Sequence, residues 1–451
     1  METVDSPALP IYSWAPGLEA GAVQQARNCA QLPVAFHHVA VMADGHQGYG
    51  VPIGAVVALA NAISPYAVGN DIGCGMALVP TTVRRDELLA PLPTKSGVPG
   101  PLARDEIMGR VQGAVPSGAE AHRDGRGSAE VDALLDVAFD AMEEAGELAG
   151  TELSTSPSAQ EGTGRPLVRE EFLRRGRSHL GTLGSGNHFI ELLADPDGLV
   201  WLMLHSGSRG VGGLVCNNFH RMALRYCREN HHVLPDPGLA WLPVGDGGEC
   251  WGRVGACYER ALRSALDYAE HNRRRMLEAV AALIERHLPE AMRWEGTVNI
   301  HHNDAALEEH YGQRVWVHRK GAVKAAAGTP TITPGSMGSG SYLGRGLGRA
   351  ESFSSCSHGA GRVLSRGQAK RELSLQAQLE AIEQAGGKVF ASSKEAVLDE
   401  MPGAYKDLDQ VMAHQADLVE AVLRLMPLAT YKGADSPRRR RKGAWRPEEE
   451  R

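Results

Sequence analysis

The sequence predicts an α+β protein, in which strands and helices occur together without a regular alternation of the two along the chain. Apolar runs typical of strands are separated by glycine-rich turns, and longer segments with helical periodicity stand between them. The chain has 451 residues, of which 43% are hydrophobic and 22% charged, so a wholly disordered protein is excluded. This length suits two or three domains or one large domain.

Three segments are expected to form strands. Residues 51–60 are a mostly apolar run of the buried-strand type, between glycine-rich turns at 42–50 and 69–75. Residues 199–204 are a second apolar run, which ends directly before a histidine. Residues 314–319 alternate between polar and apolar side chains, which is typical of a strand with two different faces.

Four segments are expected to form helices. Residues 130–148 are rich in alanine and have apolar residues at helical spacing. Residues 264–288 place their apolar side chains on one helical face. Two later helices are expected near 374–384 and 404–425.

Composition excludes several classes of protein. The formal net charge of −7 argues against attraction of the whole surface to nucleic acid, although it leaves room for a local basic site. No run of 18 apolar residues occurs, and the acidic N-terminus resembles no signal peptide, so we expect neither a membrane span nor secretion. The seven cysteines contain no Cys-x-x-Cys pair, which favours a reducing cytoplasm.

Four short segments each place a metal-capable side chain at the end of an apolar run and surround it with glycine. A single histidine of this kind is more often a structural residue, but four such segments in one chain favour a metal centre. One turn carries both a carboxylate and a thiol, and the other ligands come from distant segments, as in catalytic sites. The candidates are Asp71 with Cys74, then His188, His205, and the pair His301 and His302.

The residue types leave the identity of the metal open. Carboxylate and imidazole suit manganese, iron or zinc, whereas a thiolate favours softer ions, so residue chemistry alone puts zinc first. One aspartate, one cysteine and at least three histidines are too many ligands for a single tetrahedral ion. Two ions bridged by the Cys74 thiolate would use them all, and paired metals suit phosphoryl chemistry.

A second glycine-rich cluster occupies residues 333–342 and 355–362. Glycine-rich backbone can turn its N–H groups toward phosphate oxygens, although these segments match neither standard phosphate-binding motif. His358 lies in this cluster with Arg362 four residues later, which suits a residue that accepts a phosphoryl or nucleotidyl group. A glycine-rich turn with a capping histidine is an equally good interpretation of these residues alone.

Other histidines and cations have two interpretations each. His37, His38 and His46 flank the first glycine-rich turn and would either support the metals or make structural hydrogen bonds. Arg209 and residues 318–320 would either form a solvated surface or bind a polyanionic substrate. Cys356 and the remaining cysteines are expected to be packing residues.

Taken together, these motifs resemble those of the RtcB family of RNA ligases. That family joins an RNA 3′-phosphate or 2′,3′-cyclic phosphate to a 5′-hydroxyl and uses GTP and Mn²⁺. The resemblance runs from His37 to Lys432, so it covers most of the chain. The shared motifs, in the family's order, are DGHQGYG, GNDIGCG, GNH, HSGSRG, HHN, PGSMG and SHGAGR.

The resemblance implies a role for each candidate residue. One manganese ion would be held by Asp71, Cys74 and His188, and a second by Cys74, His205 and His302; His358 would become guanylylated. Glu191 or Ser341 would read the guanine edge. The implied GTP site comprises Asn187, His188, Phe189, Ile190, Glu191, His302, Asn303, Pro334, Gly335, Ser336, Met337, Ser341, His358, Gly359, Ala360, Gly361 and Lys432. The candidates for binding RNA phosphates are Arg209, Arg319, Lys320 and Arg362.

The resemblance also implies the domain organisation. A single catalytic domain over residues 1–432 would be built round antiparallel sheets with surrounding helices. Loose insertions are expected near 91–101 and 151–166, and a charged, disordered tail over 433–451 that carries the basic run 438–442.

The function implied by the resemblance is RNA joining through a guanylylated histidine and a 3′-guanylylated RNA intermediate, in tRNA splicing or RNA repair. The substrate would be RNA with 3′-phosphate or 2′,3′-cyclic phosphate and 5′-hydroxyl ends, and the need for an activating protein is left open. Two alternatives remain at this point: a dinuclear metal phosphodiesterase and a non-catalytic, RNA-binding scaffold subunit.

Overall fold

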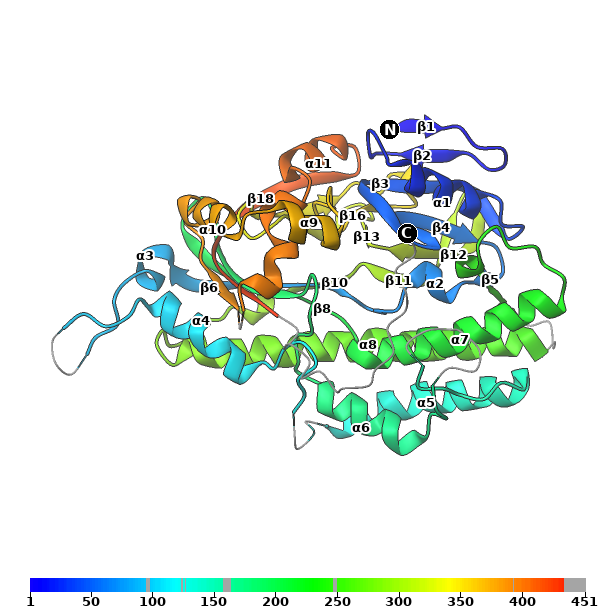
Figure 1. Cartoon of the computed structure of the whole chain (residues 1–451), viewed down its shortest axis with the longest axis horizontal. Helices are drawn as coiled ribbons and strands as arrows, with labels where there is room; N and C mark the ends of the chain where they lie inside the picture. The colour runs from blue at the N-terminus through cyan, green and yellow to red at the C-terminus, as the bar shows by residue number, and fades with distance from the viewer. Residues whose placement is uncertain are drawn as a thin grey trace.

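A computed structural model describes residues 1–94, 98–122, 125, 127–156, 164–245, 250–391 and 393–433 of the chain. Two large sheets lie side by side, and long helices run beneath both of them (Figure 1). The basic run expected at 438–442 lies outside the described residues, as does much of the insertion expected at 151–166. The division into one domain over 1–432 and a disordered tail therefore stays a prediction.

The first sheet has six strands in the order β1-β2-β3-β4-β12-β11. All neighbours in it are antiparallel except β2 and β3, which run parallel. The long β3–β4 hairpin forms the middle of this sheet. The strands are Glu2–Val4 (β1), Ile11–Ser13 (β2), Ala35–Tyr49 (β3), Val51–Leu59 (β4), Asn303–His310 (β11) and Gln313–Lys320 (β12).

The second sheet has eight strands, seven of them in the order β10-β6-β8-β7-β18-β15-β14, with β17 added parallel to β18. They are Gly75–Arg84 (β6), Phe189–Ala194 (β7), Leu199–Ser206 (β8), Val298–His301 (β10), Pro330–Pro334 (β14), Ser341–Gly346 (β15), Val389–Ala391 (β17) and Val419–Lys432 (β18). Two small ladders complete the strands: Ala322–Lys324 (β13) with Ser355–Ser357 (β16), and Ala62–Ile63 (β5) with Leu242–Pro243 (β9).

The helices flank these sheets, and in Figure 1 α5 and α6 lie below the long pair α7 and α8. The α-helices are Ala20–Ala30 (α1), Pro65–Val68 (α2), Arg85–Leu88 (α3), Ala103–Ala114 (α4), Ala129–Ala149 (α5), Arg169–His179 (α6), Arg209–Glu229 (α7), Cys250–Glu285 (α8), Arg366–Glu372 (α9), Leu375–Gln384 (α10) and Leu408–His414 (α11). Among the described residues, no helix combines the length and the apolar character needed to cross a bilayer.

Helix α8 belongs to both hydrophobic cores. Its first half contributes Tyr258 and Tyr268 to the core under the first sheet, together with α5 and α7. Its second half contributes Met276 and Val280 to the core under the second sheet. Burial of each such side chain stabilises the fold by about 1.5–3 kcal/mol. The middle of α8 is therefore fixed at the place where the two sheets meet.

The predicted fold class is confirmed, as are most of the predicted elements. Strands 51–60, 199–204 and 314–319 are β4, β8 and β12, and helices 130–148 and 374–384 are α5 and α10. The helix expected over 264–288 is part of α8, which already begins at Cys250.

Two predictions were wrong. The glycine-rich segment 42–50 was expected to be a turn, but almost all of it belongs to β3, because pairing with β4 extends to Tyr49. Residues 404–425 were expected to form one helix, but only Leu408–His414 is α-helical and β18 begins at Val419. Leu, Ala, Glu and Arg favour a helix, but pairing of β18 with β7 and β15 overrides that preference.

Candidate active site

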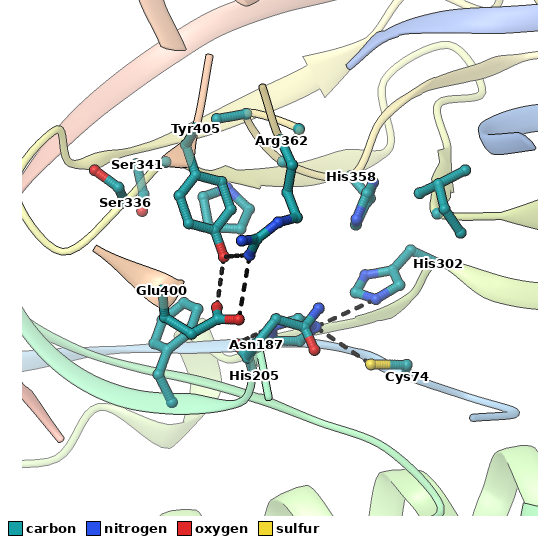
Figure 2. A pocket seen from close by; sticks show the side chains of 18 of the residues that line it. Cys74, Asn187, His205, His302, Ser336, Ser341, His358, Arg362, Glu400 and Tyr405 are labelled. Atoms are coloured by element: carbon teal, nitrogen blue, oxygen red, sulfur yellow. Dashed lines mark hydrogen bonds and ion pairs between the residues drawn. The ribbon is translucent and has the colours of Figure 1, made fainter. Parts of the chain in front are cut away.

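The candidate site is a cavity of about 350 Å³ lined by residues from both large sheets and the turns between them (Figure 2). Every glycine-rich segment that the sequence analysis singled out contributes to its wall. The lining residues include His46 and Ile53 of the first sheet, Phe189 and His205 of the second, and loop residues from 334–337 and 358–362.

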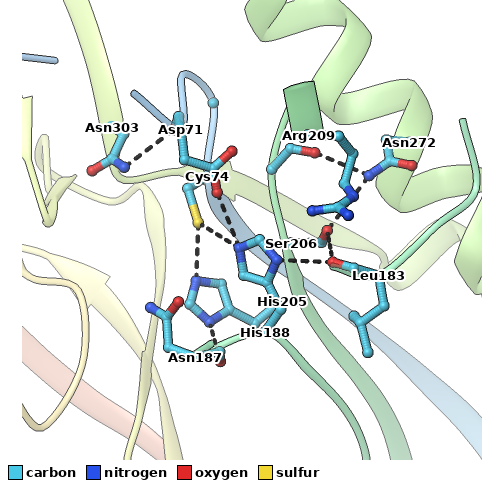
Figure 3. A network of polar contacts seen from close by, with 12 residues as sticks. Asp71, Cys74, Leu183, Asn187, His188, His205, Ser206, Arg209, Asn272 and Asn303 are labelled. Atoms are coloured by element: carbon cyan, nitrogen blue, oxygen red, sulfur yellow. Dashed lines mark hydrogen bonds and ion pairs between the residues drawn. The ribbon is translucent and has the colours of Figure 1, made fainter. Parts of the chain in front are cut away.

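Two groups of metal-capable side chains meet at one end of this cavity, and they share Cys74. The first group is Asp71, Cys74 and His188, and the second is Cys74, His205 and His302; in each, the ligand atoms lie within 4.8 Å of one another. Figure 3 shows the first group with His205. The Cys74 sulfur lies 3.4 Å from Nε2 of His188 and 3.2 Å from Nε2 of His205. These are the two sets of residues that the resemblance implied.

The turn that carries Asp71 and Cys74 depends on glycine. Gly73 adopts a φ of +70°, which is favourable only for glycine, and the N–H of Cys74 donates to the carbonyl of Asp71 at 3.0 Å. A Cβ atom at Gly207 would lie 2.3 Å from Oδ1 of Asp71. The neighbouring segment must therefore contain glycine here to leave room for the carboxylate.

The donor atoms fit metal ions. Nδ1 of His188 and Nδ1 of His205 contact the carbonyls of Leu183 (2.8 Å) and Asn187 (3.1 Å). A carbonyl only accepts hydrogen bonds, so both Nδ1 atoms carry protons and both Nε2 atoms face the site. Nε2 of His188 lies 3.0 Å from Oδ2 of Asp71, a distance that lets the two atoms share one proton or one cation. Nε2 of His205 also lies 3.3 Å from Nε2 of His302. A cation between such closely spaced lone pairs would relieve their repulsion.

The protonation states support this fit. Burial and neighbouring histidines hold the pKa values of His205 and His302 well below the usual range, so both rings are neutral. Burial raises the pKa of Asp71, but His188 outweighs it, and the pKa stays below its usual value. Burial and the charge of Asp71 raise the pKa of the Cys74 thiol, so a bound cation is needed to form the thiolate.

His301, the neighbour of His302, is not part of either group. Its Nδ1 instead lies 3.1 Å from Nη2 of Arg273. Successive side chains at the end of a strand point to opposite sides, so only one histidine of the pair can face the metal centre.

His358 lies in the same cavity, and its ring centroid is 4.8 Å from that of His302 (Figure 2). Asp44 holds the His358 turn: its Oδ2 lies 2.6 Å from Nδ1 of His358 and accepts the backbone N–H groups of His358 (3.1 Å) and Gly359 (3.2 Å). Burial raises the pKa of Asp44, but its interactions with His358, His46 and Lys406 outweigh it and hold the pKa below its usual value, so the carboxylate stays charged. A charged carboxylate at Nδ1 orients the ring and leaves Nε2 for chemistry.

The rest of the cavity contains most of the residues of the implied GTP site. Phe189 and Glu191 of β7 point into it, whereas Ile190 between them points into the hydrophobic core, so its side chain does not line the cavity. Burial raises the pKa of Glu191 to about 7. The other members of the implied set that line the cavity are Asn187, His302, Asn303, Pro334, Gly335, Ser336, Met337, Ser341, His358, Gly359, Ala360, Gly361 and Lys432.

A buried carboxylate that the sequence analysis missed, Glu400, organises the cations of this cavity. Lys432 lies 3.1 Å and Arg362 3.3 Å from its oxygens, and Arg366 and the Tyr405 hydroxyl also bind it. Burial raises the pKa of Glu400, but these cations outweigh it and lower the pKa to about 2. No local motif marks Glu400, because its partners come from separate segments. Asp44 was also missed, although it lies in the DGHQGYG motif two residues before His46.

Two of the four residues expected to bind RNA phosphates cannot reach a phosphate. Arg319 is 0% exposed and forms a bidentate pair with Glu308 at 2.8 and 3.0 Å. Lys320 is buried, and its Nζ donates to the carbonyl of Tyr49 at 2.6 Å. Both predictions were wrong because β12 lies inside the sheet with both faces covered. Arg362 lines the cavity, and Arg209 lies beside Gly184 in the segment that leads to His188.

We expect Arg319→Ala to lower the free energy of unfolding by about 3 kcal/mol, because it removes the bidentate partner of the buried Glu308 carboxylate and leaves only His310 and Lys324 beside it. Urea unfolding would measure the change. Arg345→Ala is the control, since that arginine is 58% exposed and lies 3.9 Å from Glu420, so its removal should cost less than about 1 kcal/mol. Equal stability of the Arg319 variant and the unaltered protein would contradict a structural role.

The fold and the cavity define a class of protein. Two groups of metal-capable side chains that share the Cys74 thiol lie beside a histidine held by a carboxylate and beside glycine-rich turns. This arrangement suits metal-assisted transfer of phosphoryl groups. The antiparallel sheets bring these groups together, and all of them line one cavity except His188, which contacts the lining residues Cys74 and Asp71.

Comparison with known proteins gives the family. A family model described as tRNA-splicing ligase RtcB matches residues 25–433. The chain is 38% identical to the RNA-splicing ligase RtcB of Escherichia coli, over 94% of this chain and 97% of that protein. It is 33% identical to the tRNA-splicing ligase RtcB of Thermococcus kodakarensis, over 91% of each, and to the RNA-splicing ligase RtcB of Mycobacterium tuberculosis, over 91% and 100%. The chain belongs to the RtcB family.

Proposed function

We propose that this protein is a GTP-dependent RNA ligase that joins a 3′-phosphate or 2′,3′-cyclic phosphate end to a 5′-hydroxyl end, in tRNA splicing or RNA repair. Its relatives are named RNA-splicing ligases. The observation that carries the chemistry is the position of His358, which shares one cavity with both groups of metal ligands and is held by Asp44 at 2.6 Å.

In the first step, Nε2 of His358 attacks the α-phosphorus of GTP. A nitrogen–phosphorus bond forms, the bond from the α-phosphorus to the bridging oxygen breaks, and pyrophosphate leaves with the electron pair. The ring becomes cationic as it is guanylylated, and the Asp44 carboxylate beside Nδ1 stabilises that charge. Two Mn²⁺ ions, held by the two groups of ligands, would offset negative charge on the phosphoryl oxygens.

The nucleotide would lie along the remainder of the cavity. Backbone N–H groups in the turns at 334–337 and 358–361 are suited to phosphate oxygens. Glu191, with its raised pKa, lies beside Thr430 and close to the charge of Lys432, and would accept hydrogen bonds from the guanine edge. The ring of Phe189 lines the same side of the cavity, and Nζ of Lys432 lies 5.4 Å from its centroid.

The second and third steps use the RNA ends. An oxygen of the RNA 3′-phosphate attacks the phosphorus of the histidine-bound GMP, and the electron pair of the broken bond returns to Nε2 of His358. The 5′-hydroxyl then attacks the 3′-phosphorus, loses its proton, and GMP leaves. A cyclic phosphate must first be hydrolysed to the 3′-phosphate. Arg209 and Arg362 are the remaining candidates for binding the RNA phosphates.

The metal chemistry requires a free thiol. Cys74 and the six other cysteines are unpaired in the structure, and oxidation of Cys74 would remove a ligand from both groups. A reducing compartment such as the cytoplasm would therefore suit this function.

Incubation with radiolabelled α-phosphate GTP and Mn²⁺ tests the proposal. We expect a covalent GMP adduct on His358, and joining of RNA with the stated ends. A dinuclear phosphodiesterase would cleave phosphodiesters without forming an adduct, and a scaffold subunit would do neither. Absence of the adduct with metals bound would overturn the proposal.

We expect Asp44→Asn to slow formation of the GMP adduct by roughly 100-fold or more, because asparagine keeps the shape of the residue but not its charge. The metal content should stay unchanged, since Asp44 belongs to neither group of ligands. Single-turnover labelling with GTP would measure the rate, and Asp86→Asn, at an exposed position, is the control. Labelling of the Asp44 variant at the normal rate would show that the carboxylate does not assist His358.

A further inference from the structure

We propose that Arg273 is the positioning residue for the Cys74–His205–His302 metal site. Its guanidinium binds the three chain segments that carry these ligands and so sets the spacing of the site. This inference rests on the metal pair of the proposed function and adds a residue to it that is not itself a ligand.

The contacts of Arg273 single out one group of ligands. Nη1 donates to the carbonyl of Gly73 at 2.6 Å and to the carbonyl of Ser206 at 3.0 Å. Nη2 lies 3.1 Å from Nδ1 of His301. Gly73 precedes Cys74, Ser206 follows His205, and His301 precedes His302. One planar group therefore joins the nearest neighbours of all three ligands.

The environment of Arg273 is unusual for a structural arginine. The residue is 0% exposed, and none of the ion pairs among the described residues involves it. Its fourth contact, from Nε to Oδ1 of Asn299 at 2.7 Å, is also with a neutral group. A buried charge without a carboxylate partner destabilises a fold, so this residue is not explained by stability alone.

Helix α8 gives Arg273 a rigid base, because this helix is packed into both hydrophobic cores. The preceding residue, Asn272, binds the His188 segment: its Oδ1 accepts the N–H groups of Gly181 (2.7 Å) and Thr182 (3.2 Å), just before Leu183, whose carbonyl orients His188. Its Nδ2 also donates to the carbonyl of Gly207 at 2.9 Å, so Asn272 shares the His205 segment with Arg273. Of the two residues, Arg273 is the one that also contacts Gly73 and His301, beside Cys74 and His302.

Metal binding to the full chain, without GTP or RNA, tests the inference. The metal-free protein is titrated with Mn²⁺ while free Mn²⁺ is followed by electron paramagnetic resonance. We expect two ions in the unaltered protein. In Arg273→Met, one ion should bind about 10–100-fold more weakly and the other within about threefold of normal. Arg273→Lys keeps the positive charge but loses the planar guanidinium with its several N–H donors. Its affinity for the weakened ion should lie between those of Arg273→Met and the unaltered protein.

A double-mutant cycle separates positioning from general damage. His302→Ala should remove the ion of the Cys74–His205–His302 site, so adding Arg273→Met to it should weaken the remaining ion, which keeps Cys74 as a ligand, by no more than about threefold. Co²⁺ substitution gives an independent signal, because the thiolate-to-cobalt absorption of the remaining site should also stay unchanged. Arg274→Met is the matched control, because Arg274 is the next residue on α8 and its side chain is 72% exposed.

Thermal unfolding of each metal-free variant reports on folding. If Arg273→Met does not fold, Asn299→Ala removes one acceptor at a partly exposed position and should weaken the same ion by a smaller factor. Normal binding of both ions by the Arg273 variants, or equal weakening of the remaining ion in the His302→Ala background, would overturn the inference. Fewer than two ions in the unaltered protein would instead show that the proposed metal pair is wrong.

Discussion

His358→Ala should abolish covalent transfer of GMP to the protein, a loss of about 10⁴-fold or more. Among the described residues that line the cavity, no other side chain combines an imidazole nitrogen open to the cavity with a carboxylate that orients the ring. The variant should also join neither a 3′-phosphate nor a cyclic phosphate end, since an unactivated phosphate monoester has a poor leaving oxygen. Radiolabelling from α-labelled GTP, followed by peptide mapping, measures the first effect. Both metals should remain bound, because His358 is in neither group of ligands.

Rescue makes this prediction specific. When the His358 variant receives RNA that already carries the 3′-guanylylated end, only the last step remains, and joining should return. Variants of the ligands Cys74 and His205 should not be rescued in this way, so they are the controls. If the pre-activated RNA stays unjoined while the metals are intact, His358 does more than carry GMP.

Cys74→Ala should weaken the binding of both metal ions, because the thiol belongs to both groups of ligands. Removal of a ligand from each site should lower both affinities by about 10–100-fold or more, and RNA joining should fall below detection. Elemental analysis after dialysis against a fixed Mn²⁺ concentration measures the loss.

Asp71→Ala is the matched variant for comparison, since its carboxylate belongs to one group only. It should release chiefly one ion and leave the other. Full metal content in the Cys74 variant would exclude a bridging thiolate and would show that the two sites form independently.

Much of the candidate site could be predicted, because its metal-capable side chains lie in glycine-rich segments that can be recognised in the sequence. Asp71 and Cys74 share one short turn, and any fold that keeps this turn keeps the two ligands together. The residue types alone could not decide between His301 and His302, because the choice depends on the register of β10 against β6, which pairs His301 with Gly75. The resemblance to the RtcB family supplied that choice. The partner of His358 could not be predicted either, since Asp44 is 314 residues away in the chain.

The wrong predictions share a cause, which is that tertiary pairing overrides local preference. Arg319 and Lys320 resembled surface charges because charged residues are mostly exposed, but β12 is covered on both faces, and Arg319 finds a buried carboxylate there. Residues 419–425, the end of the helix expected over 404–425, contain helix-forming side chains, but they belong to β18, which pairs with β7 on one side and β15 on the other. Composition and spacing carry no information about such neighbours.

The candidate metal ligands lie far apart along the chain, and this determines when during synthesis and folding a metal site can form. A chain still under synthesis contains Asp71, Cys74 and His188 long before it contains His302, and the unfolded chain offers no preformed site for an ion. The Cys74–His205–His302 site can therefore be completed only after α8 and β10 have been synthesised, because His302 follows both in the chain. An ion at this site then stabilises only a fold that contains β10, by about 2.7 kcal/mol at a free concentration one hundred times its dissociation constant. Metal binding there would thus stabilise completed chains and not chains that still lack His302.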